Sequence, residues 1–117
     1  MDLQTKRIYD PPAPDDGTRV LVDRLWPRGV SKEKAKLDLW LKEIAPSDEL
    51  RRWAHGPGFE FDELCRRYLA ELTANPGPVA ELAALARAGR VTLLYALADR
   101  ERNHAVFLRD VLEARER

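Results

Sequence analysis

Two short apolar runs stand out in a chain of otherwise mixed polarity. Residues 19–25 (RVLVDRL) contain Val20, Leu21 and Val22 in succession, and residues 91–97 (VTLLYAL) are almost wholly apolar. A short continuous apolar run that ends in turn residues is typical of a strand buried on both faces. Residues 3–9 (LQTKRIY) predict a weaker strand near the start of the chain.

Between and after these runs the apolar positions follow a helical spacing. Amphipathic patterns or capping residues predict five helices, around residues 32–36, from Pro46 to near His55, and over 59–74, 78–88 and 103–114. The stripe of the helix at 59–74 includes Cys65, which we expect to be a core thiol. Gly89 is expected to end its helix in a left-handed conformation.

Two segments are harder to interpret. The prolines and aspartates of residues 10–17 (DPPAPDDG) sustain neither helix nor sheet and predict an exposed loop. In residues 37–44 (LDLWLKEI), Leu37, Leu39 and Leu41 alternate as in a strand, whereas Leu37, Trp40, Leu41 and Ile44 fit a helical stripe. Both assignments remain open for this segment.

Strands that are apolar on both faces and separated by helices define the fold class. We predict an α/β fold, with a small, mostly parallel sheet of about three to four strands flanked by helices on both faces. The 117 residues match the usual size of one domain, so residues 1–117 are expected to form a single core.

Composition narrows the function classes. Lys and Arg total 20 and Asp and Glu total 20, so no large field of one sign would draw the chain to nucleic acid or to an anionic membrane. The single cysteine excludes an internal disulfide, and no apolar run approaches the roughly 20 residues of a membrane span. We therefore expect a cytoplasmic protein without a metal or cofactor, and its oligomeric state stays open.

The strand ends indicate where a site would form, because ligands of open parallel sheets bind beyond the carboxyl ends of the strands. The polar or aromatic residues at these ends and at nearby helix starts are Asp23, Arg24, Trp26, Arg28, Ser47, Tyr95, Asn103 and His104. We expect those that follow the two buried strands to lie at one edge of the sheet.

These residue types suit a small anionic ligand. Arg24 and Arg28 can bind a carboxylate or phosphate by paired hydrogen bonds, and N–H groups at the helix starts can add to them. His104 or His55 could exchange a proton near neutral pH, and Asp23 or Asp99 could orient a histidine or act as a base. A structural ion pair between Asp23 and Arg24 is the simpler alternative.

Several motifs together resemble the YeaO-like family of bacterial proteins, a domain of unknown function (number 488). They are RVLVDRLWPRG at 19–29, APS at 45–47 followed by ELR at 49–51, TLLY at 92–95 and NHA at 103–105. The resemblance implies an α/β fold and a small bacterial cytosolic protein, but no reaction. It adds Arg51 and His55 to the signature positions, and Arg51 joins the predicted ligand-binding residues.

Three functions compete on these grounds. The preferred one is binding of, or action on, a small anionic molecule that bears phosphate or carboxylate at the carboxyl edge of the sheet. A non-catalytic interaction or regulatory module is the alternative, because no recognisable catalytic motif is present. Nucleic-acid binding or modification, suggested by Trp26 between two arginines, is disfavoured by the zero net charge.

Overall fold

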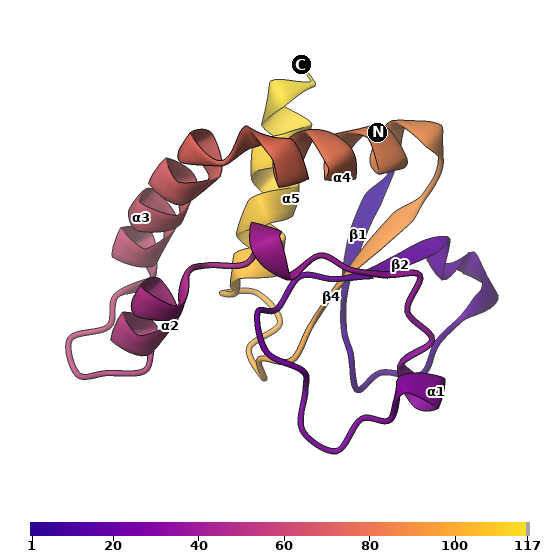
Figure 1. Ribbon diagram of the computed structural model, residues 1–117, viewed down its shortest axis with the longest axis horizontal. Coiled ribbons are helices and arrows are strands. Elements are labelled where there is room, and N and C mark those ends of the chain that lie inside the picture. Colours follow the sequence, from indigo (N-terminus) through magenta and orange to yellow (C-terminus); the bar gives the residue numbers. More distant parts are fainter. Residues whose placement is uncertain (117) are drawn as a thin grey trace.

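The computed structural model describes residues 1–116 of the chain (Figure 1). Its elements in chain order are β1 (Leu3–Arg7), η1 (Pro14–Asp16), β2 (Thr18–Leu21), α1 (Lys32–Ala35), β3 (Leu39–Trp40), η2 (Lys42–Ile44), α2 (Asp48–Ala54), α3 (Phe61–Ala74), α4 (Pro76–Ala88), β4 (Val91–Tyr95) and α5 (His104–Arg115). Within the described part of the chain, no helix is both long and apolar enough to cross a membrane.

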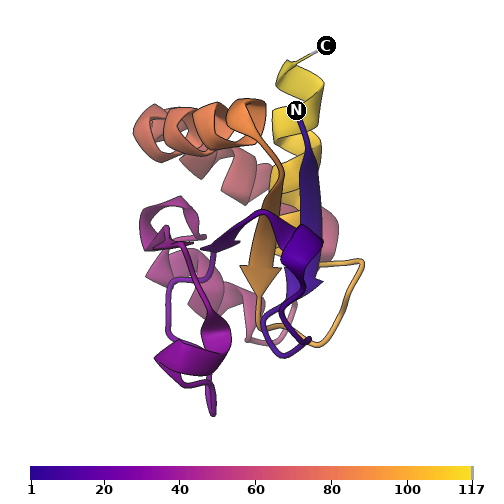
Figure 2. The ribbon, with the colours of Figure 1, turned by 90° about the vertical axis from the view of Figure 1, so that its right-hand side faces the viewer.

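The four strands form one parallel sheet in the order β1-β4-β2-β3. The last strand in sequence, β4, therefore lies between the first two, with Leu93 opposite Val20 of β2 and Thr5 of β1. Figure 2 shows β1 and β4 side by side and pointing the same way. All four carboxyl ends consequently meet at one edge of the sheet, which confirms the α/β class and the parallel sheet.

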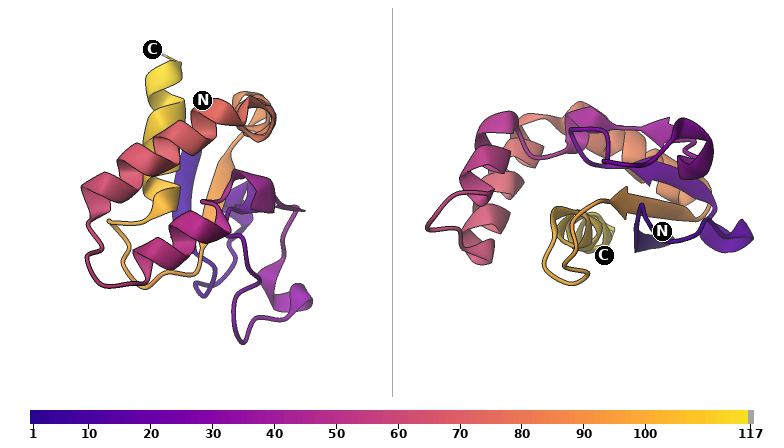
Figure 3. Two further views of the ribbon diagram at one scale, coloured as in Figure 1. Left: turned by 60° about the vertical axis from the view of Figure 1, so that its left-hand side comes forward. Right: turned by 90° about the horizontal axis from the view of Figure 1, so that it is seen from below.

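The two faces of the sheet are covered unequally. Val20, Val22 and Leu93 belong to the large core, which also contains the apolar stripes of α2, α3, α4 and α5. Leu21 and Leu94 belong to a smaller core formed with Ile8, Ala35 of α1, Trp26 of a loop and Trp40 of β3. Figure 3 shows α1 far from α3, at the other end of the molecule. The second face is thus covered by one short helix and by loops.

The ambiguous segment 37–44 forms neither a long strand nor a helix. Its strand β3 pairs only two residues, Leu39 with Val20 and Trp40 with Leu21, and then turns into the 3-10 helix η2. The pairing is short because β2 itself ends at Leu21. The strands β2 and β4 both end earlier than the apolar runs predict, although the Val22 amide still donates to the Leu94 carbonyl.

The proline-rich segment 10–17 is mostly exposed, as its composition predicts, but it contains the 3-10 helix η1 and one buried residue. Asp16 is only 2% exposed and accepts hydrogen bonds from Lys6 Nζ at 3.1 Å and from Arg19 Nη1 at 2.6 Å. Its Oδ2 also accepts from the Ala13 amide at 2.9 Å. A buried carboxylate needs such partners, so Asp16 anchors an otherwise mostly exposed segment to the interior.

Two further expectations need correction. Gly89 ends α4 with φ 174°, which is extended backbone rather than a left-handed residue. Cys65 is half-buried rather than a core residue, and the buried positions of α3 are Leu64, Tyr68 and Leu72. Burial raises the pKa of the Cys65 thiol, with a further contribution from nearby carboxylates, so its thiolate is disfavoured.

Candidate functional site

Asp23 and His104 form the centre of the carboxyl edge. Asp23 Oδ2 accepts the Ala96 amide proton at 2.9 Å, which ties the end of β2 to the end of β4. His104 Nε2 lies 3.0 Å from Asp23 Oδ1 and 3.0 Å from the carbonyl oxygen of Val22. The ion pair between Asp23 and Arg24, which the sequence suggested as the simpler alternative, does not form, because the Arg24 guanidinium is bonded to the carbonyls of Ala45 and Pro46.

The proton of this contact can be assigned by chemistry. A carbonyl oxygen only accepts, so the Nε2 that bonds to Val22 must carry a hydrogen. That N–H is directed to the carbonyl, and Asp23 Oδ1, although close, is left buried without a hydrogen-bond donor. His104 can then accept a proton only at its other ring nitrogen.

The topology explains why these two residues meet here. After β2 the chain moves outward to β3, whereas after β4 it returns through α5, which packs on β1 and β4. The two connections therefore diverge from neighbouring strands, and such a divergence creates the crevice in which open parallel sheets bind ligands. Asp23 and His104 lie where the connections diverge, in contact with each other.

Arg24 is committed to the backbone of another element. Its Nε donates to the Pro46 carbonyl and its Nη2 donates to the Ala45 carbonyl, both at 3.0 Å. These bonds fix the segment after β2 to the segment that leads into α2. Arg24 also lines a hollow of about 280 Å³ between this segment and α3, together with Tyr68 and Glu71.

Ser47 and Arg51 belong to α2 and differ in how well they are bonded. The Ser47 hydroxyl accepts from the Leu50 amide, as an N-cap does, and donates to Glu71, which also accepts from the Ser47 amide. The Arg51 guanidinium lies 3.5 Å from the partly exposed Asp48, and its Nε is buried without a partner. The hydrogen-bonding groups of Ser47 thus all have partners, whereas the Nε donor of Arg51 has none.

Tyr95 and Asn103 are buried beneath the loop that follows β4. The Asn103 side chain accepts from the Val106 amide and donates to the Asp99 carbonyl, so it both caps α5 and shapes the loop. Burial raises the pKa of Tyr95, and the hydrogen bond with Asn103 acts in the opposite direction. Both residues are therefore buried structural residues of this edge and do not face solvent.

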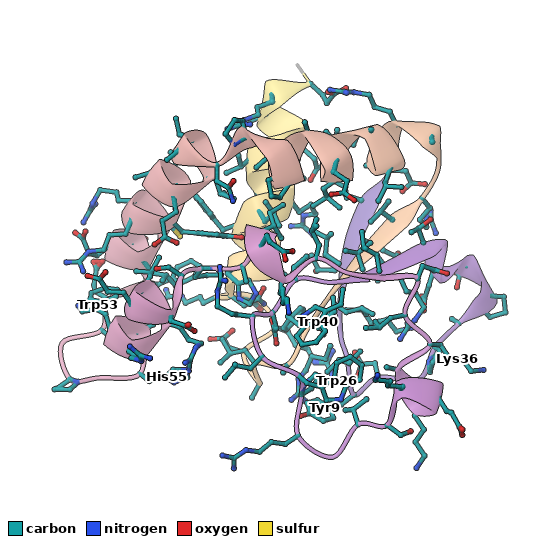
Figure 4. The ribbon with its side chains drawn as sticks, viewed as in Figure 1. Tyr9, Trp26, Lys36, Trp40, Trp53 and His55 are labelled. Atoms are coloured by element: carbon teal, nitrogen blue, oxygen red, sulfur yellow. The ribbon has the colours of Figure 1, made fainter. Side chains whose placement is uncertain are left out.

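The remaining predicted residues are spread more widely (Figure 4). Trp26 donates its indole proton to the Val30 carbonyl and packs edge-to-face on Trp40, with 5.4 Å between ring centroids. The Arg28 side chain is exposed. His55, at the end of α2 and beside Trp53, lies far from Trp26 and Trp40. The structure thus groups Asp23, Arg24, Ser47, Asn103 and His104 and leaves Arg28 and His55 outside.

Sequence reasoning missed three groups that complete this edge. Tyr68 donates to the Ile44 carbonyl at 2.7 Å and has its ring centroid 6.3 Å from that of His104. Glu71 receives both bonds from Ser47, and the Ala96 amide binds Asp23. The helical stripe could identify Tyr68 only as a core residue, and nothing local marks Glu71 or a backbone amide. Among residues 1–116, no group of three or more His, Cys, Asp or Glu side chains could hold a metal.

Fold and site together define a small parallel α/β domain whose carboxyl edge is closed by hydrogen bonds between its loops. Comparison with known families agrees: the chain belongs to the inactive DUF488-N3 subclade, whose family model matches residues 2–117. It is 45% identical to the uncharacterized protein YeaO of Escherichia coli K12 over 114 residues, which cover 97% of this chain and 99% of YeaO.

Two further relatives come from mycobacteria. Uncharacterized proteins of Mycobacterium bovis and Mycobacterium tuberculosis are each 41% identical over 113 residues, covering 97% of this chain and 95% of theirs. No solved structure gives a significant match. The predicted membership of the YeaO-like family is confirmed.

Proposed function

We propose that this chain is a non-catalytic binding domain that holds a small molecule at the carboxyl edge of its sheet. The ligand would carry an anionic group, for Arg51, and a hydroxyl or amine, for Asp23. One observation carries the proposal. In residues 1–116, the buried side-chain atoms without a hydrogen-bond partner are Asp23 Oδ1 and Arg51 Nε, and both belong to the residues that the sequence marks for this site.

Such atoms are rare because an unmatched buried polar group costs about 1–3 kcal/mol. One of the two is an acceptor and the other is a cationic donor, so each calls for a complementary group on a ligand. Arg24 links the segment that contains Asp23 to the segment that leads into α2, the helix of Arg51. It follows Asp23 in sequence and donates to the carbonyls of Ala45 and Pro46 just before α2.

The bonding of the candidate catalytic groups supports binding rather than reaction. His104 Nε2 is directed at a backbone carbonyl, and the Ser47 hydroxyl is used as both donor and acceptor. His55 is exposed at the far end of α2. A general base must reach the proton that it removes. The Glu71 carboxylate that accepts from the Ser47 hydroxyl also accepts from the Ser47 amide, which is the bonding of a structural helix cap. The description of the family as an inactive subclade agrees with this interpretation.

A thermal-shift screen tests the proposal, because a ligand that binds the folded state raises the melting temperature by mass action. The probes are ribose 5-phosphate, 3-phosphoglycerate and citrate, each compared with inorganic phosphate and with ribose or glycerol. We expect a shift only with probes that combine an anionic group and a hydroxyl.

Two variants locate the site. Asp23→Asn keeps an oxygen that can accept from Ala96 and should fold normally but lose the shift, and Arg51→Met should lose it as well. Arg52→Met removes an exposed arginine from the same helix and should leave the shift intact. A shift that survives Asp23→Asn and Arg51→Met, or no shift with any probe, contradicts the proposal.

An interaction module is the second candidate, and two exposed leucines favour it. Leu25 is 55% exposed and Leu97 is 45% exposed, on the two loops that the bond between Asp23 and Ala96 joins. A protein partner would cover them. Purification from a bacterial lysate should then recover one partner in stoichiometric amount with the natural chain and not with Leu25→Asp/Leu97→Asp.

A further inference from the structure

A second hollow lies at the carboxyl edge, between the loop after β1 and the segment around α1. Its volume is about 360 Å³, within the range of small-molecule sites. Ile8, Pro11, Pro12 and Val30 give it apolar walls, and Lys34 and Lys36 give it charge. It shares no lining residue with the Asp23 site.

The charge of this hollow is positive and not neutralised from within. Lys34 and Lys36 are exposed, and no acidic side chain of residues 1–116 lies within ion-pair distance of either. Asp10 also lines the hollow, but both of its oxygens are bonded to Arg100, at 2.7 and 2.9 Å. These bonds lower the pKa of Asp10, and the negative charge of Asp10 is neutralised by Arg100 rather than by the lysines.

The segment of sequence around this hollow is also positively charged. Between residues 28 and 36 the charged residues are four basic ones and a single acid: Arg28, Lys32, Glu33, Lys34 and Lys36. In a chain whose net charge is zero, this segment is a local concentration of positive charge.

Lys36 has a backbone conformation that lysine seldom adopts. It is the one residue other than glycine with a positive φ among those described, at φ 47° and ψ 49°. The conformation serves the fold, because the Lys36 carbonyl accepts from Arg19 Nε at 3.1 Å. Glycine would make the same backbone bond without the steric cost, so the fold does not explain the lysine side chain.

We propose that this hollow, between Tyr9–Pro12 and Gly29–Lys36, is a second binding site, which takes a small anion carried on an apolar body. The ammonium groups of Lys34 and Lys36 meet the phosphate or carboxylate, and the proline and valine walls contact the apolar part. Figure 4 shows two of its borders, Tyr9 below Trp26 and Lys36 beside α1. Tyr9 is held there because its hydroxyl donates to the Arg28 carbonyl at 2.9 Å.

Phenyl phosphate is the probe, and its binding is followed by amide shifts in two-dimensional ¹H–¹⁵N NMR spectra. Titration should move the amides of Ile8, Val30 and Lys36 with saturation at millimolar concentration. Inorganic phosphate and benzyl alcohol, each of which has half of the required chemistry, should bind at least about tenfold more weakly. Equal affinity for inorganic phosphate overturns the role of the apolar walls.

The decisive variant is Lys36→Gly, because it removes the ammonium group and relieves the backbone at the same time. We expect its melting temperature to stay the same or rise while its affinity for phenyl phosphate falls about tenfold or more. Lys32→Ala is the matched control, since Lys32 is exposed on the same helix but does not line the hollow. Its affinity should change less than twofold.

Three results overturn this second site: no binding of phenyl phosphate, binding that Lys36→Gly leaves unchanged, or equal losses in Lys36→Gly and Lys32→Ala. Asp23→Asn separates it from the first site, because that substitution should leave phenyl phosphate binding as it is. Loss of phenyl phosphate binding in Asp23→Asn with retention in Lys36→Gly would assign the ligand to the first site instead.

Discussion

Asp16 and Asp23 show how differently two aspartates beside the same strand can be used. Every oxygen of Asp16 has a donor, supplied by Lys6, Arg19 and the Ala13 amide. Asp23 has a donor for Oδ2 and none for Oδ1. Full bonding is typical of a structural carboxylate, whereas the incomplete bonding of Asp23 leaves one acceptor for the ligand that we propose.

Asp16→Asn is expected to lower the free energy of unfolding at pH 7 by about 3–5 kcal/mol, because it leaves the buried Arg19 without its counter-charge. Unfolding in urea, followed by tryptophan fluorescence, measures the loss. Asp10→Asn is the control, since its bonds to Arg100 are at the surface and contribute less than about 1 kcal/mol. Losses of equal size in the two variants would show that the Asp16 cluster is not a buried ion pair.

Acid should destabilise the natural chain more than the Asp16→Asn variant. Burial alone would raise the pKa of Asp16, but bonds from the Ala13 amide, Lys6 and Arg19 outweigh it and lower the pKa below 3.8. The unfolded chain then takes up the proton first as the pH falls. The stability due to the Asp16 charge is therefore complete above about pH 4 and lost below it. Stability that falls between about pH 4 and pH 2 as steeply in Asp16→Asn as in the natural chain would contradict this.

At the scale of elements, the junction between η1 and β2 depends on one glycine. Gly17 has φ 67°, and a Cβ atom there would lie 2.3 Å from the Arg90 carbonyl oxygen just before β4. This close approach lets the Thr18 amide bond to the same carbonyl at 2.9 Å, at the start of the pairing between β2 and β4.

Gly17→Ala is expected to destabilise the fold by about 3 kcal/mol or more, from an unfavourable φ together with a backbone clash. Gly29 provides a matched control, because it has φ 75° but open space around its Cβ position. Gly29→Ala should cost only the conformational part, about 1 kcal/mol. Urea unfolding of both variants checks the difference. Equal losses of unfolding free energy would show that the backbone around Arg90 moves away from the added Cβ atom without destabilising the fold.

Elements with a regular period could be predicted from the sequence, and contacts between distant segments could not. The stripe of Val79, Leu82, Ala83 and Ala86 in α4 is buried as its 3.6-residue spacing predicts. The burial of Asp16 within the segment 10–17 could not be predicted, because its partners Lys6 and Arg19 lie outside that segment. The strand ends indicate the meeting of Asp23 with His104, but the commitment of Arg24 to the carbonyls before α2 has no local signal.

At the scale of the whole molecule, order should decrease from the centre of the sheet to the segment around α1. All five residues of β4 are buried, and the strand is bonded to a neighbour on each side. In contrast, α1 has four residues, of which only Ala35 is buried. The large core with its four helices stabilises the first region, and a few loop side chains cover the second.

Hydrogen exchange measured by NMR should reproduce this gradient. The amides of Leu93 and Leu94 are expected to exchange only through global unfolding, and those of Lys34 and Ala35 through local opening at least about a hundredfold faster. Phenyl phosphate, if it binds as proposed, should slow exchange around α1 and leave β4 unchanged. Equal protection in both regions without ligand would contradict the gradient.

The outer strands of the sheet have a consequence for self-association. One edge is β3, with two residues, and the other is β1, which carries Lys6 and Arg7. Very short strands and basic side chains make poor templates for a further strand. The sheet is therefore resistant to growth by edge-to-edge pairing, which leaves the helices and loops as the better surfaces for contact between copies.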